Sequence, residues 1–189
     1  MKKYLLIAAF AGLIACDSKK TDEKKEEAKV QVPVVAPIPV ATKPNEVGRM
    51  VFAMLKTLDN QHNLASLQSK FLTMEELREM ADNPNLIKSG TLQDNFKRGT
   101  RESFEEDRAR DNQAFKKNAT EYQIDWQNIE YFDYLSLEEA KEKEDAGLYM
   151  RILEFKSKGK KYGVLIFSLF NGKEYKVVKV EELSLAPVK

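Results

Sequence analysis

The stretch that decides the fold is Tyr162-Gly163-Val164-Leu165-Ile166-Phe167-Ser168-Leu169-Phe170, which is followed by Asn171-Gly172. Apolar side chains occupy both alternating sets of positions in it, which predicts a strand with two apolar faces. Asn-Gly is a strong hairpin signal, so we expect residues 175–183 to form the next antiparallel strand. Before the stretch, the turn Lys158-Gly159-Lys160 leads back to a predicted strand over residues 148–155.

Both faces of this central strand need cover. Val164 and Ile166 lie on one face, and Leu165, Phe167 and Leu169 lie on the other. One face must meet helices, and the other needs cover too, because monomers rarely expose large apolar patches. The cover is a partner sheet, a second copy of the chain, an apolar ligand, or the curl of the strand's own sheet.

A further strand is expected over residues 124–132, where aromatic and β-branched residues recur. The alternation shifts once within it, which is the pattern of a β-bulge. Residues 137–145 are charged and helix-prone, so we interpret them as an excursion between this strand and the strand over 148–155. The four predicted strands form an antiparallel meander.

Helical periodicity precedes the sheet. A helix is predicted over residues 46–59, and Thr73 with Glu76 has the spacing of a capping box. A third helical region over residues 92–119 is mostly charged, and Gly99 indicates a break in it. The apolar positions of the first helix are Val47, Met50, Val51, Met54, Leu55 and Leu58, and those of the third region are Leu92, Phe96, Phe104 and Phe115.

Helices followed by an antiparallel meander predict an α+β fold. The order resembles the cystatin-like and nuclear-transport-factor-2-like folds, and is most similar to small bacterial lipoproteins of that type. The resemblance is carried by Asp125-Trp126, residues 148–155, and residues 162–170 with Asn171-Gly172-Lys173. It implies N-terminal helices packed on a curved antiparallel sheet of about four strands, in a globular domain over residues 46–189.

The N-terminus has the pattern of an export signal. Lys2-Lys3 precedes an uncharged run over residues 4–15, which is too short to span a membrane as a helix. The run leads into Leu13-Ile14-Ala15-Cys16, which resembles the lipobox of bacterial lipoproteins position by position. The resemblance implies that residues 1–15 are a signal peptide that is removed. It also implies that Cys16 carries diacylglycerol and, in many bacteria, an amide-linked acyl chain such as palmitate.

Residues 16–45 are expected to be the lipidated cysteine and a disordered tether. Residues 19–29 form a charged block, and residues 30–44 carry four prolines, which favour extended polyproline geometry. The protein is therefore expected to be membrane-anchored in the bacterial cell envelope, at the inner or the outer membrane.

The composition narrows the expected chemistry. Without Lys2 and Lys3, 29 basic residues face 30 acidic ones, so the charge balance does not indicate a nucleic-acid partner. Cys16 is the only cysteine and His62 the only histidine, so we expect no metal site and no disulfide. No phosphate-binding loop or nucleophile motif is present, and no cofactor is expected.

A few residues are candidate ligand contacts, and they are Asp125, Tyr131, Tyr149 and Tyr162. Active members of the resembled superfamily are similar to ketosteroid isomerases, in which a desolvated carboxylate base faces acid donors. Asp125 and Glu154 are the carboxylates whose positions suit that role. Strand carboxylates beside aromatic residues usually face solvent, however, so we predict no catalytic residue and no enzymatic activity.

Three functional hypotheses follow. The first is a non-enzymatic envelope lipoprotein that binds a protein partner or a small apolar ligand, or forms a homodimer through the sheet. The second is a pocket enzyme of the isomerase or dehydratase kind. The third is an inhibitor or immunity lipoprotein whose charged helix at 100–118 contacts a target through Arg101, Arg108 or Arg110. A closed pocket with a buried carboxylate and an opposed tyrosine favours the enzyme, whereas a packed or open sheet favours binding.

Replacement of Cys16 tests the anchor. The lipid on this sulfur is expected to hold the protein at the bilayer, because two or three acyl chains anchor far more firmly than one. We expect Cys16→Ala to move the protein from the membrane fraction to the soluble fraction on ultracentrifugation. Ser18→Ala leaves the lipobox intact and should stay with the membranes. Unchanged membrane association of Cys16→Ala would count against the anchor.

Overall fold

The structure is a computed structural model that describes residues 37–137 and 144–186. The predicted signal peptide, Cys16 and most of the tether lie outside the described residues, as does most of the helical excursion expected over 137–145. In the described part of the chain, no helix combines the length and apolar character that a crossing of the bilayer requires.

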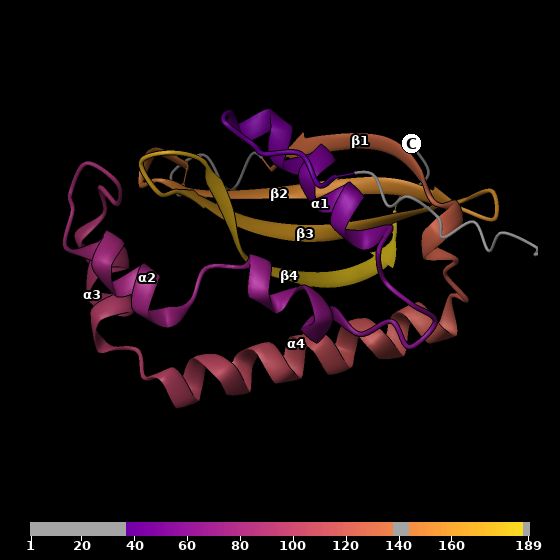
Figure 1. The fold of residues 1–189 in the computed structure, drawn as a ribbon, viewed down its shortest axis with the longest axis horizontal. Helices are drawn as coiled ribbons and strands as arrows, with labels where there is room; N and C mark the ends of the chain where they lie inside the picture. Colours follow the sequence, from indigo (N-terminus) through magenta and orange to yellow (C-terminus); the bar gives the residue numbers. More distant parts are fainter. Residues whose placement is uncertain (1–36, 138–143, 187–189) are drawn as a thin grey trace, which may run out of the picture. The chain divides into compact units, whose positions relative to one another are not determined.

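Four antiparallel strands form one sheet, in the order in which they follow one another along the chain (Figure 1). The strands are β1 (Glu130–Ser136), β2 (Leu148–Ser157), β3 (Lys160–Phe170) and β4 (Tyr175–Leu185). Both predicted hairpins are present. In the loop between β3 and β4, the Asn171 side chain accepts hydrogen bonds from the backbone N–H groups of Lys173 and Glu174. The predicted meander and α+β class are confirmed.

The first strand begins later than predicted. Residues 126–128 form a short 3₁₀ helix, η3 (Trp126–Asn128), and β1 starts only at Glu130. The cause is the indole of Trp126, which is buried between Phe115 and Phe155 at ring-centroid distances of 5.3 and 5.6 Å. Packing between elements far apart in sequence therefore overrides the local alternation. The predicted bulge is present, between Tyr131 and Asp133.

The helices largely follow the predicted pattern. They are α1 (Val47–Leu55), α2 (Met74–Ala81), α3 (Gly90–Arg98) and α4 (Arg101–Glu121), with the short 3₁₀ helices η1 (Pro44–Glu46) and η2 (Leu64–Lys70). The capping box is confirmed, because Thr73 Oγ1 accepts from the Glu76 N–H and Glu76 Oε2 accepts from the Thr73 N–H. Gly99 ends α3, as its position predicted, whereas η2 was not predicted.

The main core lies between one face of the sheet and a layer formed by α1, η2 and the C-terminal half of α4. Its strand side chains lie on one alternating set of positions, which includes Leu153, Phe155, Val164 and Ile166. The buried side chains that the helices contribute include Val47, Met50, Val51, Met54, Leu64 and Phe115. This face of the sheet is the one on which the helices pack along the length of the strands.

A second, smaller core covers the opposite face at one end only. Leu169 and Val178 pack there against α2, α3 and the connection between them. The helical side chains include Leu77 and Met80, which are buried, and Phe96, which is partly buried. Leu165 and Phe167 lie on the same face of β3 as Leu169, and both remain partly exposed. The cover predicted for this face is therefore present only toward the end of the sheet where Phe167 and Leu169 contact the second core.

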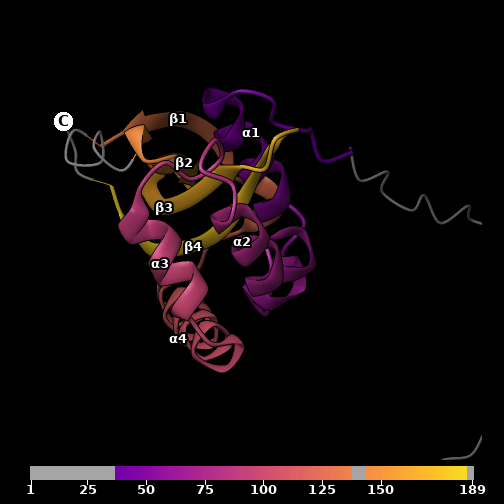
Figure 2. The ribbon, with the colours of Figure 1, turned by 90° about the vertical axis from the view of Figure 1, so that its left-hand side faces the viewer.

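The edge of the sheet at β4 is closed by backbone pairing and by α4, which runs alongside this strand (Figure 2). The Leu72 N–H donates to the Val177 carbonyl oxygen at 2.8 Å, and Phe71 forms a parallel bridge with Val177. Arg108 of α4 is buried, and its guanidinium donates to the carbonyl oxygens of Leu72 and Val178. A charged side chain thus satisfies two backbone acceptors that water does not reach.

The folded part of the chain begins before residue 46, where the sequence placed its start. The Ala41 side chain is fully buried, and its carbonyl oxygen accepts a hydrogen bond from the Tyr175 N–H at 2.7 Å. Ile38 packs against the main core as well. The tether predicted over residues 16–45 therefore ends too late in the chain. Local composition could not indicate that the residues before 46 pair with β4.

Gly48 sets how closely α1 approaches β1, and its substitution tests that packing. A Cβ at this position would lie 2.5 Å from Cγ of Tyr134, so Gly48→Ala forces the helix and strand apart. We expect the free energy of unfolding in urea to fall by about 1–3 kcal/mol, as overpacking usually costs.

Gly90→Ala is the matched control for this substitution. A Cβ at Gly90 meets no atom within 4 Å, and alanine is the better helix former, so its stability should be unchanged or slightly higher. Equal stability of the two variants would contradict the close contact between α1 and β1.

Candidate functional site

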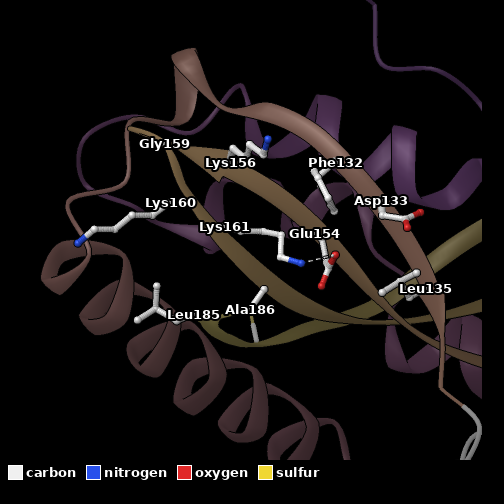
Figure 3. A pocket seen from close by; sticks show the side chains of 10 residues that line it. All are labelled: Phe132, Asp133, Leu135, Glu154, Lys156, Gly159, Lys160, Lys161, Leu185 and Ala186. Atoms are coloured by element: carbon white, nitrogen blue, oxygen red, sulfur yellow. Dashed lines mark hydrogen bonds and ion pairs between the residues drawn. The ribbon is translucent and has the colours of Figure 1, made fainter. Parts of the chain in front are cut away.

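A groove opens on the face of the sheet that the helices leave partly bare (Figure 3). Its volume is about 570 Å³, which lies in the usual range for small-molecule sites. Four apolar residues line it, namely Phe132, Leu135, Leu185 and Ala186. The groove is thus an apolar surface bordered by all four strands, beside the hairpin that joins β2 and β3.

The β-bulge in β1 produces one of the exposed walls of this groove. Tyr131 pairs with Phe155 and Asp133 pairs with Glu154, so Phe132 is the extra residue between two consecutive pairs. The Phe132 side chain is 47% exposed, which is unusual for a phenylalanine beside a core strand. In a regular strand Phe132 itself would pair with Glu154. The bulge gives that pairing to Asp133, so it changes which side chains face the groove.

The charged groups of the groove are an ion pair and a set of lysines. Glu154 is 4% exposed, and its Oε2 accepts a hydrogen bond from Lys161 Nζ at 3.3 Å. The ammonium groups of Lys156 and Lys161 lie 5.1 and 4.8 Å from the centroid of the Phe132 ring, within the range of cation–π attraction. Two ammonium groups therefore lie against the aromatic ring, and that of Lys161 is also paired with the buried Glu154.

None of the four residues predicted as ligand contacts lines this groove. Tyr131 packs edge-on against Phe52, and the Arg49 guanidinium lies 4.7 Å from its ring centroid. Tyr162 lies beside Phe155 in the main core. These tyrosines belong to the helix-covered face, where their rings fill the core.

Tyr149 lies in a polar cluster at the other end of β2. Its ring contacts Tyr175 edge-on at a centroid distance of 5.3 Å. The guanidinium of Arg151 forms a two-point ion pair with Glu144 at 3.0 and 3.3 Å, and lies 5.7 Å from the ring centroids of Tyr149 and Tyr134. Burial raises the pKa of the Tyr134 and Tyr175 hydroxyls well above the ordinary value for tyrosine. These hydroxyls therefore stay protonated at neutral pH.

Asp125 borders a different, polar hollow, also of about 570 Å³, at the loop end of the main core. Its carboxylate accepts a hydrogen bond from the Asn128 amide at 2.8 Å. His62 lines the same hollow, and its Nδ1 accepts from Trp126 Nε1 at 2.8 Å, which leaves the proton of the neutral ring on Nε2. Burial lowers the pKa of His62, which favours this neutral form.

The candidate carboxylates and tyrosines do not meet. Glu154 faces the groove, whereas Tyr131, Tyr149 and Tyr162 lie on the opposite face of the sheet. Asp125 contacts an amide and lies in a separate hollow. These residues therefore do not form the opposed carboxylate and tyrosine that isomerase chemistry needs. Within residues 37–137 and 144–186, no group of three or more metal-ligating side chains is present.

Among the residues that shape the groove, the sequence analysis had singled out Glu154 as a candidate carboxylate and missed the others as site residues. A local signal existed for its basic rim, because four lysines fall within residues 156–161. No local signal indicated Leu185, which pairs with Tyr162 across the sheet and is 55% exposed. Phe132 was included in the first predicted strand, but its exposure depends on the exact position of the bulge.

In comparisons with known proteins, the chain matches no family model, no curated protein and no solved structure. The resemblances drawn from the sequence therefore stay predictions.

Proposed function

We propose that this protein is a lipid-anchored lipoprotein of the bacterial cell envelope whose domain binds small apolar or amphiphilic molecules in the groove beside β1. The anchor is supported by the lipobox pattern that ends at Cys16. The single observation that carries the binding role is the groove itself, in which apolar side chains form the walls and lysines the rim.

The chemistry of the groove favours a ligand with an apolar body and a negative charge. Phe132, Leu135 and Leu185 offer apolar surface that is partly exposed to water. Binding becomes more favourable by about 25 cal/mol of free energy for each Å² of apolar surface that a ligand removes from water. Lys156 and Lys160 line the same groove, and neither forms an ion pair with a carboxylate of the described residues. An anionic group can therefore bind at the rim without displacing an existing partner.

The alternative hypotheses receive less support. An isomerase or dehydratase needs a base opposed by an acid, and the candidate groups lie on opposite faces of the sheet. The inhibitor hypothesis invoked Arg108 as a contact, but this side chain is 7% exposed and bonds to two backbone carbonyl oxygens. A homodimer through the sheet remains a proposal, in which a second copy takes the place of the ligand on the open face.

Fluorescence titration with anilinonaphthalene sulfonate, an apolar ring system with one negative charge, tests the binding role. We expect the dye to bind the wild-type domain, and Phe132→Ser combined with Leu185→Ser to raise the Kd at least about tenfold, because two apolar walls are lost. Both side chains are about half exposed, so the variant should fold normally.

Val40→Ser is the matched control, because Val40 is the other large apolar side chain of the described residues that is strongly exposed, at 63%, and it does not line the groove. Its Kd should equal that of the wild type. Weakening of dye binding by the control to the same degree, or no binding to the wild type, would refute the groove as the site.

A further inference from the structure

The hairpin between β2 and β3 carries a dense positive charge. Lys156, Lys158, Lys160 and Lys161 fall within six residues, with no acidic residue among them. Lys161 is paired with Glu154, whereas no carboxylate of the described residues forms an ion pair with the other three. Basic and acidic residues are nearly balanced over the whole chain, so this is a local concentration of charge.

Apolar side chains stand exposed beside these lysines. The described residues contain three large apolar side chains that are strongly exposed, and two of them are Phe132 and Leu185, at 47% and 55%. Both line the groove next to the hairpin, together with three of its lysines. Exposed apolar groups within a ring of lysines form an amphipathic patch, in which long stems cover apolar surface and the charges reach outward.

The hairpin holds this patch at one end of the sheet. Lys158 and Gly159 both have left-handed backbone conformations, at φ 50° and 76°, which is the geometry of a tight two-residue turn. The turn lies at the end of the sheet away from α2 and α3 (Figure 1), and the Lys160 side chain extends outward from the groove (Figure 3). None of the described residues that line the groove at this end belongs to a helix.

We propose that this basic hairpin, with Phe132 and Leu185, docks the domain on a bilayer surface that contains anionic lipids. The charge of the patch is complementary to such a surface, and the apolar pair is placed to enter the boundary between headgroups and acyl chains. All four cations are lysines. Lysine is depleted from protein–protein interfaces, whereas lysine clusters bind anionic membranes as point charges without fixed geometry.

This docking goes beyond the proposed function and requires neither a ligand in the groove nor the lipid on Cys16. If the lipid anchor is present, it raises the local concentration of the domain at the membrane, so that even weak docking orients the domain. The hairpin and the two exposed side chains would then set which face of the sheet meets the bilayer.

Vesicle co-sedimentation of the chain from residue 17 onward tests the proposal without interference from the signal peptide or the lipid. All buried core residues of the described structure lie between Ala41 and Ala186, so this chain retains every contact of both cores. We expect at least about tenfold stronger partitioning to vesicles of phosphatidylcholine with phosphatidylglycerol than to phosphatidylcholine alone, and loss of this preference in high salt.

Lysine variants distinguish membrane binding by the hairpin from attraction by positive charge elsewhere on the protein. Lys158→Gln with Lys160→Gln should reduce partitioning to anionic vesicles about twentyfold, since each lysine near such a surface strengthens partitioning about fivefold. Lys70→Gln with Lys88→Gln removes the same charge from exposed positions elsewhere and should leave partitioning nearly unchanged. Phe132→Ser with Leu185→Ser should also weaken partitioning, and this loss should persist in high salt.

Equal losses in the two lysine variants, or no preference of the wild type for anionic vesicles, would overturn the proposal. Retention of the wild type on immobilised polyglutamate without vesicle binding would assign the hairpin to an acidic polypeptide and would also overturn it. Failure of vesicle binding with intact dye binding in the groove would refute the docking alone, whereas the reverse result would refute the groove ligand alone.

Discussion

The structure depends on the burial of β3 on both of its faces. Val164 and Ile166 are fully buried under the helical layer, and Leu169 is fully buried on the other face under α2 and α3. Leu165 and Phe167 share the face of Leu169 and stay partly exposed, and Phe167 packs against the second core. Because the second core covers only one end of the sheet, the other end is left with apolar side chains at a solvent boundary, and the groove and the basic hairpin both lie there.

The parts of the fold that were predictable rest on short-range physics. Alternation along β3, the Asn171-Gly172 turn, the capping box at Thr73 and the break at Gly99 each involve residues a few positions apart. The parts that were not predictable depend on contacts between distant residues. Trp126 lies in a 3₁₀ helix and not in a strand because its ring packs between Phe115 and Phe155. Phe71 lies at the edge of the sheet because it pairs with Val177.

The same distinction explains the candidate site. Tyr131, Tyr149 and Tyr162 were candidates because of their hydroxyl groups. They lie on the face of the sheet that the helices cover, where their rings pack against other aromatic residues and arginines. The groove is instead made by the register of β1 and by the far end of β4, which no local pattern reports. Only its lysine rim is a local feature, and its meaning depends on the exposed side chains of Phe132 and Leu185 beside it.

Alkylation of single cysteines on β3 in the folded protein measures most directly how differently the two faces of the sheet are buried. The chain from residue 17 onward has no cysteine of its own, so a thiol introduced at Leu165 or at Val164 is the only reactive group. These neighbours point to opposite faces. The account predicts that Leu165→Cys reacts in the folded protein while Val164→Cys reacts only on unfolding. Equal protection of both thiols would show that the second face is covered at Leu165 as well, and would contradict the difference in burial between the two faces of β3.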